Sequence, residues 1–198
     1  MQILRIDSST NGEQSITRQL TQAITDHFTA ANPGATLVKR DLVANPLAHI
    51  DTVTTEAIRT PPESHSEAAA AAYPAERAVL DQFLASDVVI IGAPMYNFSI
   101  PSQLKSWLDR LGVAGVTFKY SENGPEGLAG GRKVVIASAR GGEYENGTMT
   151  ENQESLLLTM LGFIGVDDVT TIRVDKVGYG PDAIAAGMAA AKEKIDEL

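Results

Sequence analysis

The segment of residues 87–108, DVVIIGAPMYNFSIPSQLKSWL, constrains the fold of this chain more than any other. Its first part, residues 88–91, is a continuous apolar run rich in β-branched residues, which predicts a strand buried on both faces. From Pro101 onward, Leu104, Trp107, Leu108 and Leu111 recur at helical spacing, and proline suits a first helical turn. The segment therefore predicts a buried strand that leads through a short turn into a helix.

Four further apolar runs predict strands, and helical patterns lie between them. The strands are expected at residues 3–6, 35–40, 134–137 and 169–174, and the helices at residues 16–32, 74–84, 156–164 and 181–198. Five strands that alternate with helices predict an α/β fold, a doubly wound parallel sheet with helices on both faces. Neither an internal repeat nor a linker divides the sequence, so we expect a single domain that spans residues 1–198.

Three segments are expected to depart from simple alternation. Threonines and a Pro-Pro pair in residues 49–73 predict an excursion over the surface with a helical piece at each end, followed by a helix that begins at Pro74. Alternating Val116, Phe118 and Tyr120 within residues 112–131 predict a short hairpin or extended arm. Thr150 with Gln153 predicts a capping box before the next helix.

Composition excludes several classes of function. The formal net charge of −9 argues against non-specific binding to nucleic acid or to an anionic membrane surface. The chain has no cysteine, so disulfides, thiolate nucleophiles and cysteine-ligated metals are excluded, and any redox chemistry must belong to a bound cofactor. No apolar window approaches the ~18 residues of a membrane-spanning helix, and we expect a cytoplasmic protein.

The first loop is rich in hydroxyl groups, which it carries at Ser8, Ser9, Thr10, Ser15 and Thr17. Because the N-terminus of a helix presents free N–H groups and a positive dipole end, this loop favours a phosphate site that needs no lysine. The alternative is that Ser15 only caps the helix. The loop has neither a G-x-G-x-x-G nor a P-loop pattern, so a mononucleotide fits better than a dinucleotide.

Two other loops are expected at the same edge of the sheet, because right-handed crossovers bring the carboxyl ends of parallel strands together. Residues 95–98 supply two aromatic side chains and an amide, which suit a flat ligand. Gly141 and Gly142 permit close approach of backbone N–H groups, although a Gly-Gly pair by itself more often makes a turn. The three loops together predict one ligand crevice.

No catalytic side chain and no metal site is predicted. His27, His49 and His65 have no acidic or hydroxyl partner at a diagnostic spacing, so we expect structural or solvated roles for all three. Glu122, Glu126, Glu143 and Glu145 are expected to be solvated loop charges.

Several tracts stand out in combination: the hydroxyl loop, Ala93-Pro94-Met95-Tyr96-Asn97-Phe98, residues 115–120 with 122–128, Arg140-Gly141-Gly142, and residues 161–165. With them the chain resembles the FMN-dependent NADH-azoreductases, a family that also acts on quinones. The resemblance extends from the first strand to residues 179–181. It implies a flavodoxin-like fold, bound FMN, NADH or NADPH as reductant, and a homodimer.

The resemblance also implies which residues contact the cofactor and the substrates. The cofactor-binding residues are then Ser9, Ser15, Ile16, Thr17, Met95, Tyr96, Asn97, Phe98, Ala139, Arg140, Gly141 and Gly142. Thr17 and Ala139 stand where serine is common in the family, and Ala139 has only backbone groups to offer. Tyr120 and Phe163 are expected to form the walls of the substrate pocket in their own subunit or in the partner's, although core packing is an equal alternative for Phe163.

The reaction that the resemblance implies is a ping-pong transfer of two electrons. The reduced nicotinamide gives a hydride to the flavin and leaves, and a quinone or an aromatic azo compound then takes the electrons. The main alternative is a flavodoxin-type electron carrier, which docks protein partners in place of small substrates. A second alternative is a ligand-binding regulator on the same fold.

Overall fold

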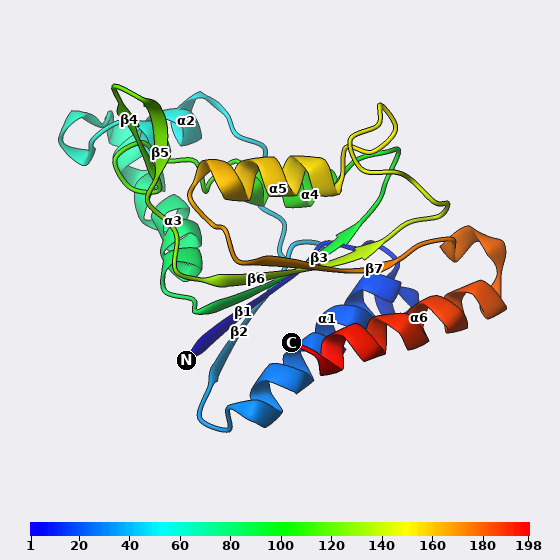
Figure 1. Ribbon diagram of the computed structural model, residues 1–198. Coiled ribbons are helices and arrows are strands. Elements are labelled where there is room, and N and C mark those ends of the chain that lie inside the picture. The colour runs from blue at the N-terminus through cyan, green and yellow to red at the C-terminus, as the bar shows by residue number, and fades with distance from the viewer.

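The computed structural model describes residues 1–198 and contains a central five-stranded parallel sheet (Figure 1). The strands follow the order β2-β1-β3-β6-β7, so the chain winds outward from β1 in both directions. Every predicted strand is present: those at residues 3–6, 88–91 and 134–137 extend further by one to three residues at an end, the one at 35–40 is shifted by one residue, and the one at 169–174 has the predicted bounds. The strands are β1 (Gln2–Asp7), β2 (Thr36–Asp41), β3 (Val88–Pro94), β6 (Lys133–Ala139) and β7 (Val169–Val174).

Helices cover both faces of the sheet, as predicted (Figure 1). On one face lie α1 (Ile16–Ala31) and α6 (Pro181–Asp196), and on the other lie α3 (Glu67–Leu84), α4 (Ser102–Leu108) and α5 (Glu154–Phe163). The short helix α2 (Thr52–Arg59) packs on α3. None of these helices has the length and apolarity to cross a membrane.

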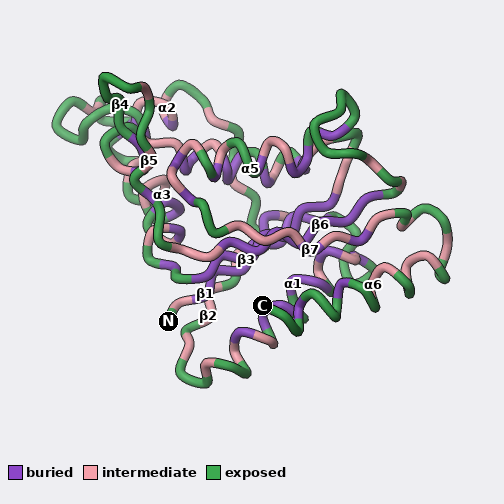
Figure 2. The backbone as a smooth tube through the Cα atoms, in the orientation of Figure 1, coloured by how far each residue is buried: buried purple, intermediate pink, exposed green.

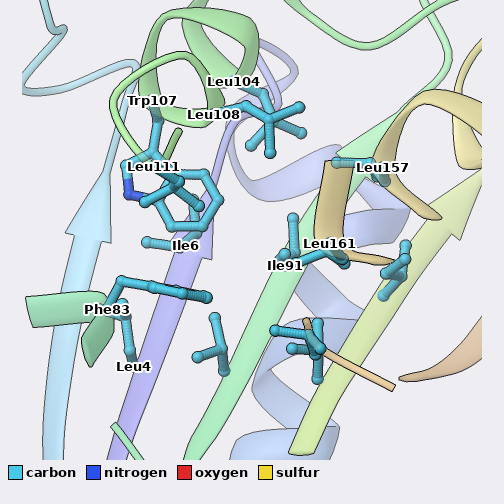
Figure 3. Packing of buried hydrophobic residues seen from close by; sticks show 14 of the residues in the cluster. Leu4, Ile6, Phe83, Ile91, Leu104, Trp107, Leu108, Leu111, Leu157 and Leu161 are labelled. Carbon is cyan, nitrogen blue, oxygen red and sulfur yellow. The ribbon is translucent and has the colours of Figure 1, made fainter. Parts of the chain in front are cut away.

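Each face of the sheet has its own apolar core, and the buried residues follow the strands and the inward faces of the helices (Figure 2). Trp107 of α4 is fully buried and meets the ring of Phe83 edge-on, with centroids 6.1 Å apart (Figure 3). Strand β3 is buried along its whole length, because it is central in the sheet and covered on both sides. The strand predicted within residues 87–108 is therefore at the centre of the fold.

The predicted arm is a two-stranded antiparallel hairpin, β4 (Phe118–Ser121) and β5 (Gly124–Gly127). It packs against the end of α5, where the N–H of Ala129 donates to the carbonyl of Ile164 at 2.8 Å. Gly127 touches the backbone there: a Cβ on it would lie 2.2 Å from the nitrogen of Gly165. The hairpin is thus fixed by a backbone-to-backbone contact that admits only glycine.

The prediction that a helix begins at Pro74 is wrong, because α3 starts at Glu67 and continues through the proline. Ser66 caps the helix by accepting the N–H of Ala69, and an alanine-rich stretch of high helix propensity follows. Buried Val79 and Phe83 hold the second half of α3 on the sheet. Tertiary packing and strong local propensity therefore outweigh the lost hydrogen bond of one proline.

The helical piece at the start of the excursion is confirmed as α2. The prediction of a capping box at Thr150 is wrong, since α5 begins at Glu154 and the side chain of Gln153 makes no capping bond. Glu151 takes that role, with one carboxylate oxygen accepting the N–H groups of Gln153 at 3.0 Å and Glu154 at 2.8 Å. A carboxylate also interacts favourably with the positive end of the helix dipole.

Candidate functional site

The turns after β1, β3 and β6 meet at the carboxyl edge of the sheet and form one crevice. Nine of the residues predicted to bind a cofactor line it, namely Ser9, Ser15, Ile16, Thr17, Met95, Tyr96, Ala139, Arg140 and Gly141. Asn97, Phe98 and Gly142 belong to the same turns but do not line this hollow. The sequence analysis missed Asn11, Gln14, Pro94 and Val177, which also line it.

Val177 reaches the crevice because the chain after β7 runs beside the glycine turn. The N–H of Val177 donates to the carbonyl of Arg140, and the N–H of Gly178 donates to that of Gly141, both at 3.0 Å. The N–H of Lys176 reaches the carbonyl of Gly142 at the same distance. These three bonds leave the N–H side of the glycine turn free, and no local sequence signal announces them.

The first turn ends at the N-terminus of α1. Ser15 caps the helix, since its side chain accepts the N–H of Arg18 at 3.2 Å, whereas the N–H groups of Ile16 and Thr17 have no acceptor in the chain. Capping and anion binding are therefore compatible here: one N–H is satisfied by the cap, and the next two remain available. Free N–H groups at the positive end of a helix dipole bind phosphate well.

Tyr96 connects the first turn to the second. Its hydroxyl oxygen accepts the N–H of Thr10 at 3.0 Å and lies 3.0 Å from the Thr10 hydroxyl and 3.4 Å from that of Ser9. Burial alone would raise the pKa of Tyr96, but these hydrogen bonds outweigh burial and lower it. The Tyr96 hydroxyl thus lies among the hydroxyl groups of the first turn.

An arginine of α1 fixes the shape of the first turn from behind. Arg18 donates to the carbonyl of Ser9 from Nη2 at 2.9 Å and forms a two-bond ion pair with Asp41 at 2.6 and 2.9 Å. The hydrogen bond from Arg18 is the main cause that lowers the pKa of Asp41 to about 2. Asp41 in turn accepts the N–H of Val43 at 2.9 Å. The loop therefore depends on an ionised Asp41.

This dependence predicts a specific response to acid. Because the pKa of Asp41 falls from 3.8 to about 2 on folding, the stabilisation is fully present above pH 4 and is lost as the pH falls toward 2. Replacing Asp41 with asparagine should lower the free energy of unfolding by up to about 1 kcal/mol at pH 7, and by clearly less at pH 3. Urea titrations at both pH values measure this difference, and an equal effect at the two would contradict it.

The second turn has an unusual backbone. Asn97 and Phe98 both have positive φ, 48° and 69°, and the N–H of Tyr96 donates to the carbonyl of Ser99 at 2.8 Å. Two left-handed residues inside such a turn are typical of type I′, where Asn followed by Gly is preferred. Phe98 takes the glycine position and leaves its ring 48% exposed. Such strain is usually retained at functional positions, and the N–H groups of Asn97 and Phe98 have no acceptor in the chain.

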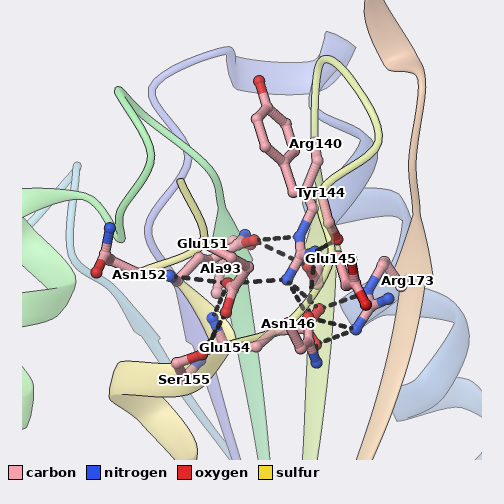
Figure 4. Close-up of polar contacts among 12 residues, drawn as sticks. Ala93, Arg140, Tyr144, Glu145, Asn146, Glu151, Asn152, Glu154, Ser155 and Arg173 are labelled. Atoms are coloured by element: carbon pink, nitrogen blue, oxygen red, sulfur yellow. Dashed lines mark hydrogen bonds and ion pairs between the residues drawn. The ribbon is translucent and has the colours of Figure 1, made fainter. Parts of the chain in front are cut away.

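The third turn presents backbone rather than side chains. Arg140 is fully buried, and its side chain points away from the crevice. Its Nη2 atom pairs with Glu151 at 2.9 Å and with Glu154 at 3.0 Å (Figure 4). Arg140 can therefore offer only backbone groups to a ligand. The N–H groups of Gly141 and Gly142 donate to no acceptor in the chain. Open space surrounds the place of a Cβ on Gly141, which keeps this backbone accessible.

Tyr144 is an aromatic group beside the second and third turns that the sequence analysis missed. Its ring points away from the buried polar network (Figure 4) and meets Phe98 edge-on, with centroids 6.0 Å apart. A Cβ on Gly142 would lie 3.4 Å from this ring. The glycine and the tyrosine ring are therefore neighbours, and the aromatic surface extends from the second turn to the third.

The two predicted substrate residues lie elsewhere in this chain. Tyr120 is 77% exposed on the hairpin, and Phe163 packs on Phe118 with ring centroids 4.5 Å apart. Phe118 also meets Tyr120, at 5.5 Å, so the three rings form one cluster. The hairpin lies at the opposite end of α5 from the crevice (Figure 1), and neither residue lines the crevice of its own chain.

A cavity of about 440 Å³, larger than the crevice of about 140 Å³, lies away from it, between α2, α3 and residues 113–116. Its buried cation, Arg110, is already bound by Glu76 at 2.5 Å and by the carbonyl of Ser106 at 2.7 Å. None of the residues predicted to bind a ligand line it. Size alone therefore does not identify the site, whereas free backbone donors do.

The side chains form no evident group for metal binding or acid–base catalysis. No group of three His, Asp or Glu side chains could hold a metal ion. His27 lies edge-on to Phe28 and His65 edge-on to Tyr73, away from the crevice. The crevice itself offers hydroxyl groups, free N–H groups and an aromatic surface, which suit an anionic ligand with a flat ring.

Comparison with known proteins agrees with this geometry. A family model described as "Flavodoxin-like fold" matches residues 1–198. The chain is 50% identical to an FMN-dependent NADH:quinone oxidoreductase of Azospirillum brasilense, across 100% of this chain and 97% of the relative. It is 45% identical to a protein of the same name from Ralstonia nicotianae, with the same coverage.

Solved structures give the same result. The azoreductase from Bacillus anthracis strain Sterne superposes over 100% of both chains with a TM-score of 0.89 and 28% sequence identity. The resemblance inferred from the sequence tracts is confirmed. The chain therefore belongs to the flavodoxin-like family that includes the FMN-dependent NADH:quinone oxidoreductases.

Proposed function

We propose that this chain, acting as one domain over residues 1–198, is an FMN-dependent oxidoreductase that passes two electrons from NADH to quinones and aromatic azo compounds. The observation that carries the proposal is the convergence of three turns with free N–H groups at one sheet edge. Relatives named as FMN-dependent NADH:quinone oxidoreductases match the whole chain. The use of NADH fits the cytoplasmic location that we propose.

The residues at the crevice fit FMN group by group. The free N–H groups of Ile16 and Thr17, with the surrounding hydroxyl groups, suit the phosphate. Phe98 and Tyr144 offer an aromatic surface beside the place for a flat ring. The free N–H groups of Gly141 and Gly142 can stabilise negative charge at the edge of that ring, as in an oxyanion hole.

When bound, the flavin supplies the redox chemistry, and the protein contributes position and electrostatics. The chain would hold the phosphate at the start of α1. Hydrogen bonds to the carbonyl groups of Ser9 and of the glycine turn fix the loops that carry the free N–H groups. Arg140 contributes no side chain to the reaction, because its guanidinium is enclosed by Glu151 and Glu154. No side chain of the crevice is assigned as a general acid, so we assign proton delivery to water.

Anaerobic mixing of the FMN-loaded protein with NADH tests the proposal. Prompt bleaching of the flavin absorbance, followed by its return when a quinone is added, is the expected result. An electron carrier of the flavodoxin type would not be reduced by NADH without a partner reductase, and a protein that retains no FMN after gel filtration would contradict the proposal outright. Reduction of the flavin by NADH alone separates an enzyme from a carrier.

A prediction concerns Asn97, whose left-handed backbone calls for a glycine control. Replacing Asn97 with glycine removes the side chain and keeps φ unstrained. We expect the dissociation constant for FMN to rise by roughly tenfold, which corresponds to the ~1.4 kcal/mol of a lost side-chain hydrogen bond, with an unchanged melting temperature. Flavin fluorescence titration measures the first quantity and calorimetry the second; unchanged affinity would remove Asn97 from the site.

We further propose that the enzyme is a homodimer in which Tyr120 and Phe163 reach the partner's crevice. Two observations support this arrangement: Tyr120 is highly exposed, and the hairpin lies at the far end of α5 from the crevice of its own chain (Figure 1). An exposed aromatic side chain on an ordered arm suits a protein interface.

The corresponding prediction is that Tyr120→Ala changes relative rates across a panel of quinones and azo compounds by several-fold, and leaves FMN affinity unchanged. Lys119→Ala, on the same strand, is the control. Mixed dimers of the Tyr120→Ala and Asn97→Gly variants decide whose crevice Tyr120 serves. If it acts on the partner, one site per mixed dimer is intact and activity returns; if it acts in its own chain, mixing restores nothing.

A further inference from the structure

One buried side chain joins the turn after β3 to the turn after β6. Gln153 is fully buried, and its Nε2 donates to the carbonyl of Ala93 at 2.5 Å. Its Oε1 accepts from Nε of Arg140 at 2.8 Å and from the hydroxyl of Ser138 at 3.2 Å. A single amide group therefore holds both strand ends at the point where they enter the crevice.

The location of these contacts explains why they matter. Ala93 and Ser138 are paired neighbours in the β3–β6 ladder, and the last ladder bond runs from the N–H of Met95 to the carbonyl of Ala139 at 2.8 Å. Beyond it the strands diverge into the two turns that carry the free N–H groups. The bonds of Gln153 lie just before this divergence.

Gln153 is available for this role because another residue caps α5. Glu151 accepts the N–H groups of the first turn, and its other oxygen accepts from the hydroxyl of Ser155 at 2.5 Å. The side chain of Gln153 makes no capping bond and instead turns toward the sheet. Its four neighbours, Ser138, Arg140, Glu151 and Glu154, are all fully or almost fully buried, so no water replaces the amide if it is removed.

We infer that Gln153 is a positioning residue for the flavin: by joining Ala93 to Arg140, it fixes the spacing of the second and third turns around the ring. This inference rests on the proposed function. Gln153 does not line the crevice, so it would act only through the position of the backbone. Donors that stabilise charge do so only when they are held in place in advance.

Loss of the amide should therefore alter two properties of the bound flavin. With Gln153→Met, the carbonyl of Ala93 and the Nε of Arg140 lose their partner, and the two turns shift apart or rotate. FMN then binds about tenfold more weakly, and its midpoint potential becomes more negative, because the N–H groups of Gly141 and Gly142 no longer face the charge of the reduced ring. A purely structural role would lower the melting temperature and change neither property.

The experiment compares wild type, Gln153→Met and Gln82→Met as FMN-loaded protein. Gln82 accepts from Nε and Nη2 of Arg40 at 3.0 and 2.6 Å and does not line the crevice, so it accepts from an arginine as Gln153 does, without joining the second and third turns. FMN dissociation constants, midpoint potentials and melting temperatures are measured for all three. Weaker binding with a lower potential in Gln153→Met alone is expected.

A change in melting temperature without a change in affinity and potential would overturn the inference, and so would equal changes in both variants. If Gln153→Met does not fold, Gln153→Glu decides, because it keeps an acceptor for Arg140 and puts a carboxylate oxygen in place of the donor to Ala93; the same two changes are expected from it. If wild type itself binds no FMN, the proposed function fails and not the role of Gln153.

Discussion

Replacing Arg140 with methionine is expected to lower the free energy of unfolding by about 3–5 kcal/mol. The guanidinium of Arg140 is fully buried and pairs with Glu151 and Glu154, which are themselves about 1% exposed (Figure 4). Methionine fills much of the same space but leaves these carboxylates short of positive charge; Arg173 alone remains beside Glu154. Urea unfolding of the variant at pH 7, compared with wild type, measures the loss.

The matched control is Arg77→Met, which breaks the pair with Asp81, whose side chain is 54% exposed, and should cost less than about 1 kcal/mol. In wild type, burial raises the pKa of Glu154, but bonds from Arg173 and the charge of Arg140 lower it overall. Without Arg140 this pKa should rise, so the variant's deficit should shrink as the pH falls toward 4. A deficit below 1 kcal/mol, or one that grows in acid, would contradict the prediction.

The convergence of the three turns could be predicted from the sequence because it follows from rules that each depend on local signals. An apolar run such as residues 88–91 indicates a buried strand, and alternation with helices makes the sheet parallel. Parallel strands then place all their following loops at one edge. The position of the crevice could thus be predicted without knowledge of side-chain contacts. Most of the residues predicted to line it do so.

The direction of a side chain in that edge could not be predicted. Arg140 was expected to contact a cofactor, yet its side chain turns inward because Glu151, Gln153 and Glu154 lie behind it, more than ten residues later in the chain. Their short-range pattern indicated only the start of a helix. Which of them caps the helix and which reaches the sheet depends on distances in space, which spacing along the sequence does not encode.

The same limit applies to the hairpin. Alternating aromatic residues predicted the arm, and the structure confirms it, but nothing local to residues 124–127 indicates where the arm is fastened. Gly127 meets Gly165 of the segment after α5, and Gly165 has a φ of +91°. Each glycine alone suggests a turn; only together do they reveal a close contact between two backbones.

Replacing Gly127 with alanine is therefore expected to destabilise the protein by about 3 kcal/mol, at the upper end for overpacked sites. The added Cβ would lie 2.2 Å from the nitrogen of Gly165 and 2.4 Å from the carbonyl carbon of Ile164. These are backbone atoms that cannot rotate away, so the hairpin must shift and weaken the bond from Ala129 to Ile164. For a chain of this size the melting temperature should fall by roughly 6–12 °C.

Gly162→Ala provides the control on the neighbouring helix. Gly162 is an exposed residue of α5 with open space where a Cβ would be placed, so alanine should stabilise the protein by up to about 1 kcal/mol through its higher helix propensity. The two substitutions add the same methyl group a short distance apart and are expected to act in opposite directions.

Because the crevice lies at the other end of α5 (Figure 1), Gly127→Ala should also leave FMN affinity unchanged while it displaces Tyr120. Calorimetry and fluorescence titration of both variants test this; a Gly127→Ala protein as stable as wild type would mean that the contact between the two glycines does not fasten the arm.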